Sequence, residues 1–597
     1  MMTYPKEILN TRNVDVLKAI AKELGLSKDL RRKKELISAL GRLMNRRPEE
    51  YLEILDDLEM SFVTEMVHTK GRITPEEFMA NHGGEFPLDS SWSYTSNTLL
   101  HLVLAVERYR QAYVMPKEVI EHLKPHVKKP EPAKINCVED VPETYQPASY
   151  EHFNKDRPRK VHVFSGERNV FPELRRVLQE VGRGKTKLSP KSGFPTSATV
   201  KAMGNVLYIP EFQLEPDIDL HREIDGEGGP MRAFAWPVIL QQCKWATARG
   251  GALALTRTGK TVLSSLDADA MKAGFNNLLT SDSFDELRRV NRIRGQSGRA
   301  KRYMTKPSAR HRKITGSMKR WPVGKWIDIK EAFRFAYASG NGFDASTDSF
   351  YLYFEELQYG SLGNHANEIN MQYLRVFLFE YMATLGMIDA AYVFPHMLWP
   401  EFDGCWGTDN DAFCGRYDGL LYVRLNTLGA YCLGNINQYA PPEQNSVKNL
   451  TMLDNFDIVY SGGAGPSSYD NMMLDRFAKR KNDYTWKLVE KNLLDFIDKG
   501  GTLDEVNGFL EQNSGTSVPA VFKKLFEGIG KKLKSLESPE EAVLINTRDD
   551  ITAMLIANDT SAKKYCFRAG EKRLAVPHKH LGAFKTCLKK IGYVVPA

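Results

Sequence analysis

The sequence predicts a multidomain α+β protein that is predominantly helical. Three observations lead to this fold class. The chain has 597 residues, enough for roughly three to five domains of ordinary size. Apolar residues recur at helical spacing through the N-terminal region, and helices alternate with short strands toward the C-terminus. Hydrophobic residues make up 42% of the chain, which suffices for several buried cores.

Residues 1–45 are predicted to hold two short helices. In the first, Val14, Leu17 and Ile20 share one face, and Gly25 stops the helix. The second reads "KKELISALGRLM". Four basic residues stand at its start: Arg31, Arg32, Lys33 and Lys34. This pair resembles a SAP-type helix-extended-helix module, and the resemblance implies that these four cations face DNA.

Two regions follow the SAP-like pair. Residues 46–124 continue with helical patterns, one of which opens at Pro48 with acidic residues, as helix N-termini prefer. Residues 125–160 lack periodicity, and seven prolines lie from Pro116 to Pro158. We therefore expect a partly extended linker between the helical region and the next domain.

Two stretches, "LALTRTGKTVL" and "VRLNTLGAYCL", share one pattern. When Leu255 is aligned with Leu425, Gly259 falls on Gly429, and each stretch reads strand, polar residue, glycine-containing turn and helix. Glycine is expected here to permit a positive φ. The pattern is typical of the end of a winged-helix module, where the last wing strand runs into the next helix. It predicts winged-helix domains over 161–287 and 314–436.

The Gly-Lys-Thr within the first stretch does not make a phosphate-binding loop. A Walker motif needs a glycine where this chain has Ala254, because the loop must expose its N–H groups to phosphate. The cluster of Asp403, Asp409, Asp411 and Asp418 fits neither a calcium nor a zinc spacing. We therefore expect no enzyme activity, no metal and no cofactor, with a nuclease of unrecognised pattern as an alternative.

The strongest charge feature is the segment 288–320, which has thirteen Lys or Arg and no Asp or Glu. Such a density of like charge repels itself unless a polyanion is near. Its first part, 288–313, is predicted to be a basic loop that binds nucleic acid, with Tyr303 suited to stacking on a base or sugar. The other candidate residues are Arg288, Arg289, Arg292, Arg294, Arg299, Lys301, Arg302, Lys306, Arg310, Arg312 and Lys313. The alternatives are a solvated basic loop, a loop that folds onto acidic stretches of the chain such as "REIDGEGG", and a scaffold subunit whose loop docks an acidic partner.

Residues 448–597 carry a second resemblance. The residues that carry it are Phe456 to Val459, Phe477 and Ala478, Tyr484 to Thr485, Gly500, Val506 to Leu510, and Ser517 to Pro519. In this order they are similar to the N-terminal accessory domain of XPB-type helicases, in which a Tyr-x-hydroxyl step leads into a helix. Bacterial proteins without a helicase motor carry the same domain. The resemblance implies DNA engagement or docking to a helicase or nuclease, in genome maintenance or phage defence.

Compartment and partners follow from the remaining composition. The seven cysteines form no C-x-x-C pair and are odd in number, as in a reducing compartment. No apolar run is long enough to span a membrane. The sequence thus predicts a cytoplasmic, non-catalytic DNA-binding protein with no membrane partner.

Overall fold

The computed structural model confirms a mixed α/β protein, with about 49% helix and 15% strand. The chain divides into two compact units, residues 1–444 and 445–597. Within the described residues, none of the helices has the length and hydropathy of a membrane-spanning segment. The structure describes residues 4–26, 29–83, 86–88, 98–107, 112–146, 158–207, 211–212, 229–356, 360–362, 366–395, 415–441, 449–461, 466, 468–533 and 541–595.

The N-terminal region is built around one hydrophobic core that runs from Tyr4 to Val127. Its first two long helices, α2 (Val14–Glu23) and α3 (Lys33–Arg46), confirm the predicted pair. Both contribute to the shared core, so the expected boundary at residue 45 does not divide it. The other elements are α1 (Glu7–Asn10), α4 (Pro48–Leu52), α5 (Asp57–His68), α6 (Pro75–His82), η1 (Thr98–Leu102), β1 (Ala105–Glu107), β2 (Ala112–Val114) and α7 (Lys117–Leu123).

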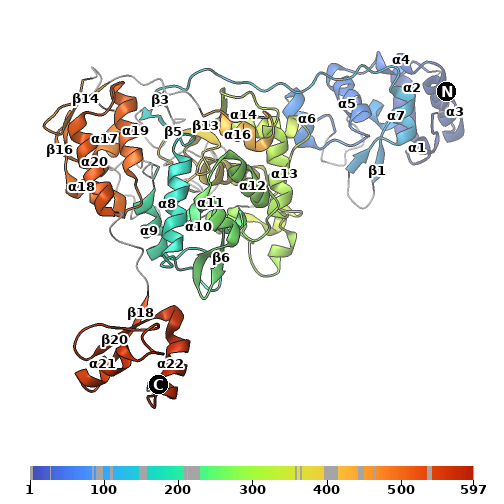
Figure 1. Ribbon diagram of the computed structural model, residues 1–597. Coiled ribbons are helices and arrows are strands. Elements are labelled where there is room, and N and C mark those ends of the chain that lie inside the picture. The colour runs from blue at the N-terminus through green and yellow to red at the C-terminus, as the bar shows by residue number, and fades with distance from the viewer. Residues whose placement is uncertain are drawn as a thin grey trace. The chain divides into compact units, whose positions relative to one another are not determined.

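A first module follows in residues 170–255. Its elements are α8 (Val170–Gly182), α9 (Ser197–Val206), α10 (Arg232–Gln242), β6 (Ala246–Arg249) and β7 (Ala252–Leu255). Strand β7 is the middle of a small sheet, because it pairs with β6 on one side and bridges to Lys187 on the other. Gly250 and Gly251 join β6 to β7 with φ of 59° and 78°, a turn that favours glycine at both positions. In Figure 1 this hairpin projects from the rest of its module.

A second module in residues 307–425 repeats this order. Its elements are α13 (Pro307–Met318), β9 (Trp326–Asp328), α14 (Ile329–Ala338), α15 (Ala366–Val376), which continues as the π-helix η5 (Phe377–Met382), β12 (Ile388–Tyr392) and β13 (Leu420–Leu425). Strand β13 again lies in the middle, between β9 and β12. An extra strand, β5 (His162–Ser165), pairs with β12 and extends the antiparallel sheet to the order β5-β12-β13-β9.

Both modules end in the same way, as the alignment of Leu255 with Leu425 predicts. Leu255 pairs with Ala246, and Leu425 pairs with Ile388. The next residue caps a helix in each case: α11 (Arg257–Ser264) after the first module and α16 (Thr427–Leu433) after the second. Side-chain caps of this kind satisfy an N–H that would lack a partner in the first helical turn.

The two glycines at these helix starts serve a different purpose from the one expected. Gly259 and Gly429 lie inside helices and are not among the residues with positive φ. A Cβ on Gly259 would lie 1.8 Å from the Trp245 carbonyl oxygen, and one on Gly429 would lie 2.0 Å from that of Met387. Glycine is required because another stretch of backbone passes close by. The prediction of a positive φ was wrong.

The third helices of the two modules pack against each other, since α10 contacts η5. All residues of η5 are buried, and all of α10 except Phe234 and Gln241. The Arg289 guanidinium covers the Phe234 ring, 3.5 Å from its centroid. Neither of these helices therefore presents a free face to a ligand. Helix α12 (Ala268–Leu279) adds to the same core by packing on α16 and α13.

Most described residues of the proline-rich segment are exposed, but its backbone is hydrogen-bonded to the second module. The N–H groups of Val138 and Trp326 each donate to the other's carbonyl, at 2.8 and 3.0 Å, beside β9. Strand β3 (Thr144–Tyr145) pairs with β4 (Arg159–Lys160). Val161 and Tyr145 pack with Trp326 in a small core on the sheet of the second module. This segment therefore covers one face of that sheet.

The second unit contains two separate sheets. The first has the order β14-β15-β17-β16 and the second β18-β20-β19. Tyr484 and Thr485 lead into strand β17, which corrects the expectation that this step enters a helix. The elements are β14 (Leu450–Met452), β15 (Asp457–Tyr460), α17 (Ser468–Phe477), β16 (Ala478–Asn482), β17 (Thr485–Leu488), α18 (Glu490–Asp498), α19 (Leu503–Ser514), α20 (Ala520–Leu533), β18 (Ala542–Asn546), α21 (Asp550–Asn558), β19 (Phe567–Arg568), β20 (Arg573–Pro577), η7 (His578–His580) and α22 (Leu581–Lys590).

Candidate nucleic-acid interface

The predicted basic loop, residues 288–313, is not one continuous loop. Helix α13 begins within it at Pro307, a residue well suited to the first position of a helix. Arg310, Arg312 and Lys313 are therefore helical residues, which corrects the loop prediction for this part. The preceding elements are η2 (Glu286–Arg289), β8 (Ile293–Arg294) and η3 (Ala300–Tyr303), and β8 pairs with β10 (Tyr353–Glu356), which pairs with β11 (Gly360–Leu362).

Two of the candidate arginines point into the protein. The Arg289 side chain is 11% exposed, and its Nε lies 2.9 Å from Oε1 of the fully buried Glu380. The Arg310 side chain is 1% exposed, and its Nη2 lies 2.5 Å from Oδ2 of Asp285. Removing one partner of such a buried pair leaves an uncompensated charge. Arg289 contacts Phe234 of the first module and Glu380 of the second, whereas Arg310 ties α13 to Asp285 in the segment between the modules. The surface considered below includes neither arginine.

A buried acid beside Arg310 belongs to the same network. Glu286 accepts hydrogen bonds from Nε2 of His311 and from the hydroxyl of Tyr373, both at 2.9 Å. Burial alone would raise the pKa of Glu286, but the charges of His311 and Arg310 and the hydrogen bond from His311 lower it to about 2. Glu286 is thus held as a carboxylate, and it stabilises the positively charged groups around it.

Most of the other candidate cations lie at the surface. Arg294 is half exposed and pairs with Glu355, with 2.7 Å between Nε and Oε2. Arg292 is half-buried, and Lys313 donates to the Gly340 carbonyl at 3.1 Å. The exposed residues of the segment are Arg288, Arg294, Arg299, Lys301, Arg302, Lys306, Arg312 and Lys313. The segment therefore keeps a positive surface, although carboxylates neutralise part of it.

The N-terminal cluster also lies at the surface, at the start of α3. Arg31, Arg32 and Lys34 are exposed, whereas Lys33 is half-buried and its Nζ donates to the Asn10 carbonyl at 2.8 Å. Cations at a helix N-terminus oppose the helix dipole. Because three of the four side chains are exposed, the cluster forms a small patch of positive charge.

The structure also brings together cations that the sequence did not single out, on the small sheet of the first module. Ala252 lies between Lys187 and Arg249, because it pairs with both. Alternate residues along a strand share a face, so Lys185 lies on the same side as Lys187. Lys185, Lys187 and Arg249 are all exposed. We call this side the outer sheet face; it consists of Lys185, Lys187, Thr247, Arg249, Ala252 and Ala254.

The region around the outer sheet face has no acidic residue in residues 181–206 or 229–266. Further exposed cations lie in the same ranges, at Lys244, Arg257 and Lys260. In the described part of the chain, no carboxylate lies within ion-pair distance of the lysines or the arginine of the outer sheet face. Small alanines along the middle strand leave backbone and cations accessible from one side. This geometry suits a row of phosphates.

The signal for this face is present in the sequence but is spread out. Its cations fall on the two segments that flank β7, Lys185 and Lys187 on one and Arg249 on the other, so no window of the sequence shows a dense run. The absence of acids over two long ranges could have revealed it. Local charge density instead favours residues 288–313.

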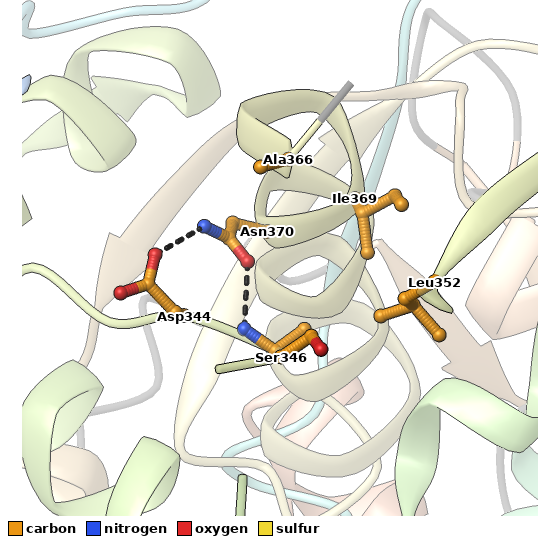
Figure 2. Close-up of a pocket in the computed structure, with 7 residues that line it drawn as sticks. Asp344, Ser346, Leu352, Ala366, Ile369 and Asn370 are labelled. Carbon is orange, nitrogen blue, oxygen red and sulfur yellow. Dashed lines mark hydrogen bonds between the residues drawn. The ribbon is translucent and has the colours of Figure 1, made fainter. Parts of the chain in front are cut away.

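The described residues offer little support for a metal site or a substrate pocket. No group of three or more His, Cys, Asp or Glu among the described residues is placed to hold a metal. Asp403, Asp409 and Asp411 lie outside the described residues. A cavity beside Asn370 is lined by Asp344, Ser346 and Leu352 (Figure 2). Its volume is about 20 Å³, the space of a single water molecule, so it cannot hold a substrate.

Comparison with known proteins does not identify a relative: no family model and no curated protein matches this chain. The geometry of the chain itself is therefore the basis for assigning a function.

Proposed function

We propose that this chain binds DNA through the sugar–phosphate backbone, as a non-catalytic protein that does not read base sequence. The observation that carries the proposal is the outer sheet face, where Lys185, Lys187 and Arg249 emerge together and no carboxylate of the described residues forms an ion pair with them. Phosphate contacts made by Lys and Arg supply most of the sequence-independent affinity for DNA.

The order of elements supports the same proposal. Helix, strand, helix, helix and two strands, with the last strand in the middle of the sheet, is the order expected for the winged-helix domains at 161–287 and 314–436. In such domains the third helix commonly enters the major groove. Here α10 and η5 are buried against each other, so base edges are beyond the reach of these helices. The hairpin of β6 and β7 is the part that remains accessible.

The exposed cations of residues 288–313 form a second contact surface in this proposal, and Arg31, Arg32 and Lys34 a third. The resemblance of residues 448–597 to the helicase accessory domain extends the proposal to a setting. The chain would work beside a helicase or nuclease, in genome maintenance or phage defence.

The test is a titration of duplex DNA over a series of salt concentrations. The variant combines Lys185→Ala, Lys187→Ala and Arg249→Ala, and we expect at least a tenfold weaker affinity at low salt. The slope of log affinity against log salt should become shallower by about 0.9 for each phosphate that the variant no longer neutralises.

The matched control removes three exposed lysines far along the chain, Lys124, Lys128 and Lys129, and should leave affinity and slope unchanged. Equal behaviour of the two triple variants would contradict the assignment of the face. A wild-type chain that does not bind DNA at low salt would overturn the proposal and favour a scaffold that docks an acidic protein.

A further inference from the structure

Phe350 is the most exposed large apolar side chain among those described, with 81% of its surface accessible. It lies in η4 (Ser349–Tyr351), directly before β10. Leaving a phenylalanine in water forgoes the stabilisation that its burial would give. Single exposed apolar side chains are common on protein surfaces, so the neighbours of Phe350 decide whether it can bind a ligand.

The ring stands at the edge of a stacked pair of tyrosines. The rings of Tyr303 and Tyr351 are parallel within 2°, with centroids 4.1 Å apart. Phe350 meets Tyr351 at 88°, with centroids 5.6 Å apart. A perpendicular contact uses at most one face of the Phe350 ring, so at least one face is left open, in keeping with its 81% exposure. We call Phe350, Tyr351 and Tyr303 the aromatic platform.

Hydrogen bonds hold the platform in place. The Tyr303 carbonyl accepts from Oγ of Ser346 at 3.1 Å and from the N–H of Thr347 at 2.7 Å. Oδ1 of Asp348 accepts from the N–H of Phe350 at 3.0 Å. The two segments that carry the aromatic rings are therefore tied together. A ligand that stacks on the platform does not have to order it first.

The residues at the start of the same loop are hydrogen-bonded to helix α15. Oδ1 of Asn370 accepts from the N–H of Ala345 at 2.8 Å, and its Nδ2 donates to Asp344 at 3.1 Å (Figure 2). Asn370 is buried on α15, in the interior of the second module. The loop that carries Phe350 and Tyr351 is therefore anchored to a buried helix.

One cation, Arg302, contacts the platform, and two more lie beside it in the sequence. The Arg302 guanidinium lies 4.8 Å from the Tyr303 ring centroid and donates to its hydroxyl at 2.9 Å. Arg299 and Lys301 are exposed on the same short segment. Two acids lie in the same loop: Asp348, whose Oδ1 accepts from the N–H of Phe350, and Asp344, which accepts from Asn370. An open ring beside three cations matches a ligand that alternates flat bases with phosphates.

We infer that the aromatic platform stacks an unpaired nucleobase while Arg299, Lys301 and Arg302 contact the adjoining phosphates, so that the chain recognises a single-stranded segment of nucleic acid. This inference rests on the proposed function and adds to it a preference in strand state. Stacking requires the face of a base, and in a duplex those faces are covered by neighbouring base pairs. A face for an apolar protein would instead need a contiguous apolar patch.

The test compares Phe350→Ala with the wild type on an oligothymidylate of about 20 nucleotides and on a duplex of equal length. We expect the variant to bind the single strand about tenfold more weakly, within the range found for removal of one base–aromatic stack. Its duplex affinity should stay within about twofold. Its salt dependence should also stay the same, because the cations that neutralise phosphates are all retained.

Two substitutions control for shape. Phe350→Trp keeps an aromatic face and should retain single-strand affinity, whereas Phe350→Leu keeps apolar volume without that face and should behave as the alanine variant. If Phe350→Ala leaves single-strand binding intact, or weakens duplex binding equally, the inference is wrong while the proposed function stands. If the wild-type chain binds neither substrate at low salt, the proposed function fails as well.

Discussion

The first and second modules place the same elements in the same order, but the outer faces of their sheets are different. With Leu255 set against Leu425, Lys187 corresponds to Asp328, since each lies opposite the middle strand three residues before these leucines. Arg249 corresponds to Ala391 by the same register. One fold thus carries cations in one copy and a mixture of acidic and apolar residues in the other.

The surroundings of the two sheets explain this difference. The face of the second sheet is covered by the segment that contains Val161 and Tyr145, and its edge is extended by β5. The cation on its middle strand, Arg424, is neutralised by Asp389, with Nη2 2.7 Å from Oδ2. The first sheet has an exposed outer face, and residues 181–206 and 229–266, which build and flank it, contain no acidic residue. The two modules share a topology, so topology does not explain why only the first sheet has exposed cations. The segment that packs over the second sheet explains it.

The largest effect that would test this comparison comes from the close backbone approach shared by both modules. Gly259→Ala and Gly429→Ala each force a methyl group to within about 2 Å of a carbonyl oxygen. We expect each substitution to lower the free energy of unfolding by about 3 kcal/mol, because the backbone must move apart. The measurement is urea unfolding followed by circular dichroism.

Gly184→Ala is the control for these variants. Gly184 has a φ of 74° and open space around its Cα, so alanine there costs only the left-handed conformation, about 1 kcal/mol. A similar loss at Gly184 would contradict the close backbone approach, and clearly different losses at Gly259 and Gly429 would contradict the equivalence of the two modules.

A smaller effect distinguishes the modules by pH. Glu167 is buried in front of α16 and accepts from the N–H of Leu428 at 2.8 Å, whereas α11 is capped by the hydroxyl of Thr256. Burial, aided by the charge of Asp389 and opposed by the α16 N–H groups, raises the pKa of Glu167 from 4.5 to about 7. The folded chain then holds this proton more tightly than the unfolded chain does.

The sign of the pH dependence follows from that difference. Between about pH 4.5 and 7 the unfolded chain loses the proton while the folded chain keeps it, so stability falls as pH rises. Glu167→Gln removes this effect. We expect its Tm to exceed that of the wild type by about 3 °C above pH 7 and to match it below about pH 4.5. A constant difference across this range would show that Glu167 does not titrate as described.

Much of the fold could be predicted from local patterns. Helical periodicity gave α2 and α3, and the alignment of Leu255 with Leu425 gave two equivalent ends of modules. These features are encoded within a few residues of each other. The cover over the second sheet could not be predicted, because a proline-rich stretch without periodicity does not reveal what it packs against.

The candidate site was predicted less well for a related reason. An acid-free run indicates free charge, but Arg289 pairs with Glu380, 91 residues away in sequence. In the first module the opposite occurs: Lys185, Lys187 and Arg249 are weakly clustered in sequence and adjacent in space. The density of charge along the sequence shows neither which cations form ion pairs with distant acids nor which cations lie near one another on adjacent strands.

Hydrogen–deuterium exchange with and without duplex DNA is the most direct test of the central claim that the outer sheet face binds the phosphate backbone. DNA should slow exchange of the backbone amides in residues 185–188 and 246–255, while those in residues 420–425 of the second sheet should not change. Protection that appears in the second sheet, or that is absent from the β6–β7 hairpin when DNA is bound, would contradict the account.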